Sequence, residues 1–148
     1  MSAKEIPLTI RAAGPPDVAA LARLAGQLGY PTTPEEAARR LAADREDSRH
    51  ELLVAETNRE VIGWISLAEE HSILHDPRVE ILGLVVDEAH RGAAVGRKLI
   101  ERAEQWARER GCRTILLRSN VIRERAHRFY ERLGYGVVKT QKVFRKPL

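Results

Sequence analysis

The sequence predicts an α/β protein in which helices flank a mixed, mostly antiparallel, splayed central sheet. Three observations predict this fold class. Short runs rich in β-branched residues alternate with amphipathic helical patterns. Two β-rich runs follow each other too closely for a crossover and so form a hairpin, whereas a later pair is joined through a long helix, as parallel strands require. We expect roughly six to seven strands and about four helices.

Length and composition indicate the number of domains, the type of ligand and the cellular compartment. The chain has 148 residues, which suits one core, and we expect a single domain over residues 1–148. The formal net charge of +4 suits a phosphate-rich ligand or a nucleic acid. No apolar signal segment opens the chain, no run reaches the roughly 18 residues of a membrane span, and Cys112 has no partner for an intrachain disulfide. These features predict a cytoplasmic protein without a membrane segment.

The first elements are a short strand and a helix. Residues 6–13 alternate apolar and polar side chains before a Gly-Pro-Pro stop. Apolar residues then recur at helical spacing over 18–29, with Asp17 at the N-cap position and Gly29 placed to end the helix. The pattern therefore predicts one strand and one amphipathic helix in the first 29 residues.

A second helix and a hairpin come next. Thr33 is placed to cap a helix over residues 32–44, and Pro34 suits its first position. Residues 51–57 and 60–70 are β-rich runs with a very short connection. We expect these two runs to form an antiparallel hairpin.

The second half predicts strands that alternate with helices. A loop is expected at 71–77, followed by a buried central strand over 78–89. Residues 94–110 carry the clearest apolar stripe of the chain, with Gly111 after it, and residues 113–118 form another buried strand. The intervening helix predicts that these last two strands are parallel.

The C-terminal part predicts a helix and further strand structure. Residues 119–134 fit a helix that Ser119 or Asn120 caps and Gly134 ends. Residues 136–148 have the pattern of one bent strand or of two short ones.

The stretch HRGAAVGRKL, residues 90–99, joins an apolar strand to the long helix. A loop that enters a helix presents unpaired N–H groups and the positive end of the helix dipole, which suits a diphosphate. Ala94 stands where glycine would be typical, and we expect it to take an ordinary helical, negative φ that leaves its amide free for phosphate. A plain strand-to-helix turn would explain Gly92 and Gly96 but not the rest of the pattern.

Together with the flanking stretches EILGLVVDEAHRG and AHRFYERLGYGVV, this loop resembles the GNAT family of acetyl-CoA-dependent N-acetyltransferases, over nearly the whole chain. The phosphate-binding signature of that family, Q/R-x-x-G-x-G/A, maps onto Arg91, Ala94 and Gly96. The resemblance implies that the loop amides bind the diphosphate of acetyl-CoA while the pantetheine arm lies beside a strand. The cofactor-binding residues that it implies are Leu84, Val85, Val86, Arg91, Gly92, Ala93, Ala94, Val95, Gly96, Arg97 and Asn120.

The resemblance also implies direct attack of an amine on the thioester, without an acyl-enzyme and without a metal. Tyr130 matches the tyrosine that faces the coenzyme sulfur and would act as general acid, unless it is a core tyrosine. Glu80 matches a glutamate that takes the amine proton, directly or through water, unless it is a surface charge beside Arg78. Asn120 fits either a pantetheine contact or a helix cap.

The function implied by the resemblance is acetylation of a primary amine on a small molecule, with the segment 25–41 bordering the acceptor site. Two alternatives stay open. Either the acceptor amine belongs to a protein or to an aminoacyl-tRNA, the latter favoured by the basic tail, or the chain is a non-catalytic acetyl-CoA-binding module. Nucleic acid is otherwise not expected as a partner. Edge strands of an open sheet would permit a homodimer.

Overall fold

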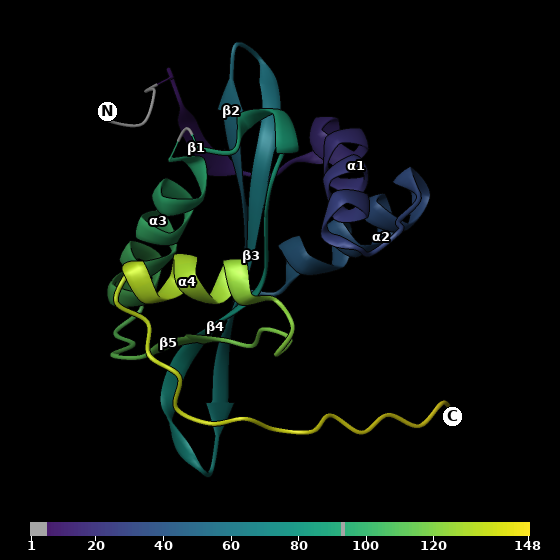
Figure 1. The fold of residues 1–148 in the computed structure, drawn as a ribbon. Helices are drawn as coiled ribbons and strands as arrows, with labels where there is room; N and C mark the ends of the chain where they lie inside the picture. The colour runs from purple at the N-terminus through teal and green to yellow at the C-terminus, as the bar shows by residue number, and fades with distance from the viewer. Residues whose placement is uncertain (1–5, 93) are drawn as a thin grey trace. The chain divides into compact units, whose positions relative to one another are not determined.

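The computed structural model describes residues 6–92 and 94–148, which divide into two compact units. The first unit reaches to Leu117, and the second runs from Arg118 to Leu148. Within the described residues of the first unit, five strands form one sheet in the order β1-β2-β3-β4-β5 (Figure 1). The single domain expected over residues 1–148 stays a prediction.

The first three strands are antiparallel neighbours in the sheet. β1 (Thr9–Ala12) pairs with β2 (His50–Thr57), which pairs with β3 (Glu60–Ser72). The turn between β2 and β3 consists of Asn58 and Arg59, both at positive φ (48° and 64°). Two such residues make the type I′ geometry whose twist matches that of the flanking strands. The predicted hairpin is confirmed.

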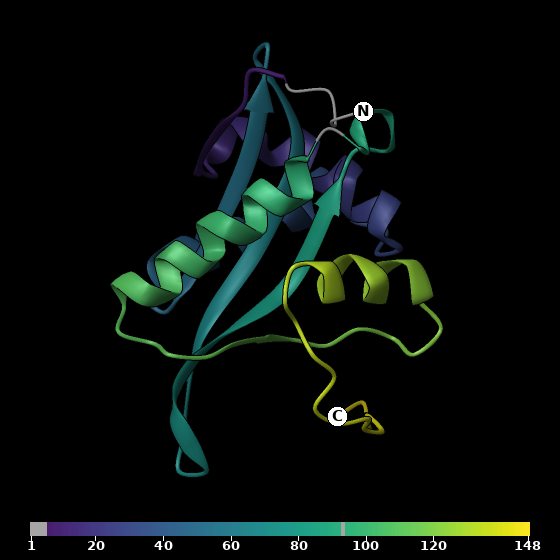
Figure 2. The same ribbon diagram turned by 60° about the vertical axis from the view of Figure 1, so that its left-hand side comes forward.

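The next hairpin corrects the sequence prediction. β4 (His75–Val86) pairs antiparallel with β3, and the loop predicted at 71–77 is instead strand on both sides of a turn made by Ile73 and Leu74. Ser72 Oγ accepts a hydrogen bond from the N–H of Leu74 (3.0 Å). The backbone ladder continues here although the side chains are polar on both faces, so side-chain alternation could not reveal it. Figure 2 shows this long hairpin extending past β5.

Helices cover both faces of the sheet in the first unit (Figures 1 and 2). α1 (Val18–Leu28) packs on β3 and β4, α2 (Pro34–Glu46) packs on β2, and α3 (Val95–Glu109) packs on β2, β3 and β4. Adjacent residues of β3 show that the helices lie on opposite faces. A Cβ at Gly63 would contact the α3 side chains, whereas Trp64 hydrogen-bonds to α1.

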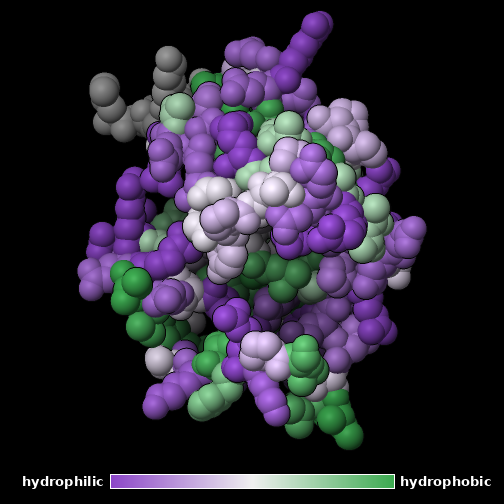
Figure 3. Space-filling view, turned by 90° about the vertical axis from the view of Figure 1, so that its right-hand side faces the viewer, coloured by the Kyte–Doolittle hydropathy of each residue, from purple (hydrophilic) through white to green (hydrophobic). Residues whose placement is uncertain are grey.

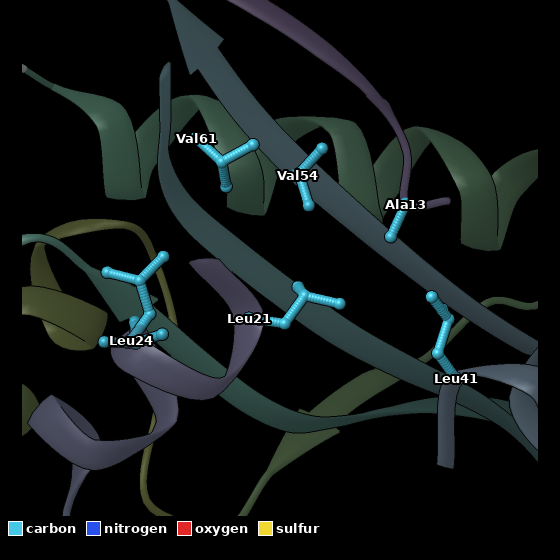
Figure 4. Packing of buried hydrophobic residues seen from close by; sticks show 7 residues of the cluster. Ala13, Leu21, Leu24, Leu41, Val54 and Val61 are labelled. Atoms are coloured by element: carbon cyan, nitrogen blue, oxygen red, sulfur yellow. The ribbon is translucent and has the colours of Figure 1, made fainter. Parts of the chain in front are cut away.

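Each face has its own apolar core. On the α1 and α2 side, buried residues from helices and strands form one cluster (Figure 4). On the other side, the apolar stripe predicted for the long helix is confirmed, because its residues are all buried. The first cluster contains Ala13, Leu21, Leu24, Leu41, Val54, Val61 and Val85. The stripe of α3 contains Val95, Leu99, Ile100, Ala103, Trp106 and Ala107.

The capping interactions at the ends of α1 and α2 are those predicted from the sequence, except at Asp17. Thr33 Oγ1 accepts a hydrogen bond from the N–H of Glu36 (3.1 Å), and Glu36 Oε1 accepts one from the N–H of Thr33 (3.0 Å), which is a complete capping box. Gly29 ends α1 at φ 99°. Asp17 occupies the predicted N-cap position of α1, but its side chain makes no cap hydrogen bond, because its carboxylate binds Arg11 and the N–H of Gly14 instead.

The crossover through α3 is parallel, as predicted. β5 (Ile115–Leu117) lies alongside β4 and pairs only with Val79–Ile81. It is shorter than predicted, and its side chains are half-buried rather than buried. The sheet is therefore mixed and mostly antiparallel, and the β5 edge covers only one part of β4.

The second unit contains one helix, α4 (Glu124–Arg132), among its described residues. The predicted N-caps, Ser119 and Asn120, are wrong, since Arg123 is the N-cap residue and no side chain caps the helix. Gly134 follows the C-cap residue at φ 94° and ends the helix, as predicted. The strand structure predicted over 136–148 is also wrong, because this exposed stretch pairs with no strand. The described sheet consequently has five strands rather than six to seven. No helix in the described part of the chain is long and apolar enough to span a membrane.

Candidate functional site

The start of α3 offers free backbone N–H groups. The N–H of Lys98 donates to the carbonyl of Ala94 (3.1 Å), and no side chain caps the helix. The N–H groups of Val95, Gly96 and Arg97 precede this hydrogen bond and have no partner within the helix. A helix of 15 residues with an uncapped start concentrates positive potential there, which favours an anionic ligand.

Ala94 differs from the sequence prediction. Its φ is +62° and its ψ is 17°, so the expected negative, helical φ is wrong. Gly92 is also left-handed, at φ +87°, and the predicted ligand residue between them, Ala93, lies outside the described residues. The chain has to turn sharply from this loop into α3, and that turn fixes the backbone regardless of the side chain. Glycine takes this conformation without strain, whereas alanine is destabilised by about 1–2 kcal/mol.

Two arginines add charge beside the free amides. Arg91 and Arg97 are both exposed, and Arg97 Nη1 lies 3.3 Å from Glu101 Oε1 one helical turn away. Uncapped amides and guanidinium groups are the donors that a diphosphate needs. The described residues of the loop therefore fit the diphosphate of a coenzyme such as acetyl-CoA.

The edge of β4 next to this loop is open. β5 pairs with β4 only as far as Ile81, so no strand within the described residues pairs with that edge over residues 82–86. This stretch includes the predicted contact residues Leu84, Val85 and Val86. On the other edge, Leu82 is an extra residue that has no partner in β3, which makes a β-bulge. An extended ligand can add to such an edge through backbone hydrogen bonds.

A pocket of about 370 Å³ lies between α1, α2 and the sheet. The segment predicted to border the acceptor, residues 25–41, forms much of its wall. Figure 3 views the face that carries α1 and α2 and shows apolar residues gathered in a hollow among polar ones. The pocket is lined by Leu21, Ala25, Leu28, Tyr30, Thr32, Ala37, Arg40, Leu41, Asp44, Leu52, Trp64, Ser66, Leu82 and Gly83. Its size is that of a small-molecule site.

Glu80 lies on the same face of the sheet as this pocket. It pairs with Ala68 of β3, two residues beyond Ser66, which lines the pocket. Residues two apart on a strand share a face, so the half-buried Glu80 stands next to the pocket floor. The register thus brings together a carboxylate, a pocket and the open edge of β4.

Tyr130 and Asn120 belong to the second unit. The ring of Tyr130 packs edge-on against Phe129 (5.2 Å between centroids) and Tyr135 (6.1 Å). Burial raises the pKa of Tyr130 above its usual value of 10, although the charge of Arg123 opposes the shift. The phenol therefore keeps its proton at neutral pH, as a general acid must.

Asn120 is held in the turn before α4. Its Oδ1 accepts a hydrogen bond from the N–H of Ile122 (3.1 Å), and its carbonyl lies 2.9 Å from His127 Nε2. A pantetheine contact from this side chain stays a prediction.

Sequence reasoning missed Trp64 and the bulge at Leu82. Trp64 forms a wall of the pocket, and its Nε1 donates to the carbonyl of Leu21 (3.3 Å). The neighbouring glycine, Gly83, was a usable signal, because a Cβ there would lie 3.0 Å from the Trp64 ring. The described residues hold no group of three or more His, Cys, Asp or Glu side chains arranged to bind a metal.

Comparison with known proteins decides the family. Residues 18–135 match the model of the acetyltransferase (GNAT) family. The chain belongs to this family. GNAT acetyltransferases use acetyl-CoA, whose diphosphate fits the loop and helix start described above.

Two curated GNAT relatives and one solved structure are similar over large parts of the chain. The aminoalkylphosphonate N-acetyltransferase of Salmonella typhimurium is 39% identical over 95 residues, which are 64% of this chain and 62% of that protein. The aminoglycoside N(6′)-acetyltransferase type 1 of Stenotrophomonas maltophilia is 27% identical over 95% of this chain and 94% of its own. Glucosamine-6-phosphate N-acetyltransferase from Arabidopsis thaliana superposes with a TM-score of 0.83 at 26% identity, covering 94% of this chain and 98% of its own.

Proposed function

We propose that this protein transfers the acetyl group of acetyl-CoA to a primary amine of a small molecule, by direct attack in a ternary complex. One observation carries the proposal. A single strand, β4, offers an open edge that leads to the uncapped start of α3, and the same strand contributes Leu82 and Gly83 to the pocket. A donor on the edge and an acceptor in the pocket would therefore meet at β4.

The donor half of the site consists mainly of backbone. The amides between Arg91 and Arg97 would hold the diphosphate, and the backbone of Leu84, Val85 and Val86 would hold the pantetheine arm. When bound, acetyl-CoA supplies an activated thioester carbonyl. Because backbone groups are fixed by the strand and the helix, they position that carbonyl without ordering flexible side chains.

The reaction needs proton transfer at two atoms, one on the acceptor and one on the donor. The attacking amine has to lose a proton, and the Glu80 carboxylate beside the pocket would accept it, directly or through a water molecule. The departing sulfur needs a proton, and Tyr130 Oη would donate it, supported by its raised pKa. The names of both curated relatives refer to small-molecule amines, which favours such an acceptor over a protein or tRNA amine.

An acceptor screen tests this function. Purified protein with acetyl-CoA and a broad panel of small amines should release free coenzyme A thiol, and mass spectrometry should find one added acetyl group on the amine. Acetyl-CoA binding should be measured in the same samples by calorimetry. Binding without thiol release across the panel would instead identify a non-catalytic acetyl-CoA-binding module.

A further inference from the structure

The chemistry of the pocket walls defines a class of acceptor. We propose, building on the function proposed above, that the acceptor is a monoamine with an apolar aromatic or branched-alkyl body, and that the pocket between α1, α2 and the sheet holds this body. The inference rests on the side chains that line the pocket, on how its charged residues are paired, and on the side of the pocket where β4 lies.

Apolar side chains form most of the pocket wall. α1 contributes Leu21, Ala25 and Leu28, and α2 contributes Ala37 and Leu41, while the strands add Leu52, Trp64 and Leu82. Tyr30, in the connection between α1 and α2, stands at the wall with 69% of its surface exposed. Such a surface gains free energy by covering an apolar ligand and loses it by desolvating a polar one.

The charged residues of the pocket do not suit a polycation or a phosphonate. Among the described lining residues, Asp44 is the one carboxylate, and its Oδ1 already lies 3.0 Å from His50 Nδ1. Arg40 is the one cationic residue, and its exposed guanidinium lies 3.3 Å from Glu36 Oε2. Several ammonium groups would require several carboxylates, and a phosphonate is best bound by converging cations.

The geometry at β4 indicates which end of the acceptor lies toward the strand. The ring of Trp64 lies over Gly83, where any Cβ would come within 3.0 Å of it, and Trp64 Nε1 is tied to the carbonyl of Leu21. The pocket floor there adjoins the bulge at Leu82, with Glu80 on the same face. An amine nitrogen at this side meets both the carboxylate and the open strand edge, and the apolar body then extends between the helices.

Three amines of similar reactivity and different bodies test the proposal. We would compare kcat/KM for phenethylamine, kanamycin and 2-aminoethylphosphonate with acetyl-CoA saturating. The expected result is at least a tenfold preference for phenethylamine, since burial of an aromatic body is worth about that factor or more. A preference for kanamycin or for 2-aminoethylphosphonate would overturn this inference and leave the acetyltransferase function standing. Thiol release with none of the three, but with another polar or polycationic amine of the broad panel, would also overturn this inference and leave the acetyltransferase function standing. No thiol release across the whole panel would overturn the acetyltransferase function itself.

Substitution of Tyr30 shows whether this pocket binds the apolar body of the acceptor. Tyr30→Ala should raise KM for phenethylamine about tenfold and leave the Kd for acetyl-CoA and the thermal midpoint unchanged, because Tyr30 is an exposed residue of the pocket wall. Ile73→Ala is the matched control, since Ile73 is a fully exposed apolar residue at the tip of the β3–β4 hairpin. An unchanged KM in Tyr30→Ala, or an equal rise in both variants, would overturn the assignment of the pocket.

Discussion

Gln27 of α1 and Asp87, directly after β4, are joined by a hydrogen bond from Gln27 Nε2 to Asp87 Oδ1 (3.4 Å). The same carboxamide accepts a hydrogen bond at Oε1 from the N–H of Glu88 (3.0 Å), and Arg23 Nη1 donates to Asp87 Oδ2 (3.2 Å). Burial alone would raise the pKa of Asp87, but hydrogen bonds from Ala89, Gln27 and Arg23 lower it. The helix that lines the pocket therefore also holds the turn that leads into the loop proposed to bind the diphosphate.

Gln27→Leu should weaken acetyl-CoA binding. The substitution keeps the size of the side chain but removes both hydrogen bonds to the turn at residues 87–88, so the loop is held less firmly. A hydrogen bond contributes about 0.5–1.5 kcal/mol between neutral groups and about 1.5–3 kcal/mol to a charged group such as the Asp87 carboxylate. Because only part of this loss reaches the loop, we expect the Kd to rise about fivefold to tenfold, as measured by calorimetry. Gln105→Leu is the control, because the exposed Gln105 of α3 hydrogen-bonds to Glu109 of the same helix, far along the chain from the turn at residues 87–88. Equal Kd values in both variants would contradict a positioning function for Gln27.

Ala94→Gly should stabilise the protein. Alanine at φ +62° is strained by about 1–2 kcal/mol relative to glycine, partly offset by the greater freedom of glycine in the unfolded chain. We expect a net gain of about 1 kcal/mol, seen as a rise of about 2–4 °C in the midpoint of thermal unfolding. Acetyl-CoA binding should be retained, since the loop amides keep their places.

The control for this substitution has the opposite sign. Ala19 is an exposed residue in the first turn of α1, and Ala19→Gly should lower stability by up to about 1 kcal/mol. If both variants lower stability, the left-handed conformation of Ala94 does not carry strain.

Local signals predicted the helices better than the strands. Thr33, Gly29 and the buried stripe of α3 act within one or two turns, so the sequence pattern contains the whole interaction. Residues 71–77 are mostly strand, and residues 136–148 are not. Both outcomes depend on whether a neighbouring strand lies alongside to pair with the segment, and side-chain patterns do not encode that. The strand count was overestimated for this reason.

The candidate site likewise has parts that local sequence signals predict and parts that they do not. The loop after β4, the start of α3 and Glu80 could be found from the motif and its flanking stretches. The φ of Ala94 could not, because closure of the loop into α3 overrides the intrinsic preference of alanine. The pocket wall at Trp64 and Gly83 depends on the register between β3 and β4, including the bulge at Leu82. Register is a long-range property, and without it only residues 25–41 of the pocket wall could be predicted to border the acceptor.

Asp17→Asn should destabilise the protein at neutral pH and much less in acid. Asp17 is buried, and its carboxylate accepts two hydrogen bonds from Arg11 (2.8 and 2.9 Å) and one from the N–H of Gly14 (2.8 Å). The Arg11 hydrogen bonds lower the pKa of Asp17, against the effect of burial. A lowered folded pKa means that the stabilisation is complete above the unfolded value near 4 and is lost as the pH falls through the folded value.

Urea unfolding at several pH values measures this effect. At pH 7 we expect Asp17→Asn to lose about 2 kcal/mol, the usual contribution of hydrogen bonds to a charged group. The difference from the wild type should shrink below about pH 4. Asp76→Asn, at an exposed carboxyl of β4, is the control and should change stability little. A loss that is independent of pH would show that the Asp17 carboxylate is not the stabilising group.

Glu80→Gln should slow turnover while the fold persists. The amide keeps the shape of the side chain but cannot accept the amine proton, and general bases contribute roughly 100-fold or more. We expect kcat/KM for the amine to fall by about that factor at neutral pH, with the Kd for acetyl-CoA unchanged. Glu51→Gln on β2 is the matched control, because its partner Leu67 places it on the opposite face of the sheet. Comparable activity in the two variants would remove Glu80 from proton transfer.

Tyr130→Phe separates donation of a proton from packing. The variant keeps the ring that packs against Phe129 and Tyr135 but lacks the hydroxyl, so it should fold and bind acetyl-CoA normally. Because burial raises the pKa of Tyr130 above 10, the wild-type phenol stays protonated across the neutral range, and its loss should lower kcat about 100-fold at pH 7. Tyr135→Phe removes a hydroxyl from the same unit and should keep its turnover. If Tyr130→Phe turns over as fast as the wild type, the departing thiolate receives its proton from another group, and Tyr130 serves only to pack α4.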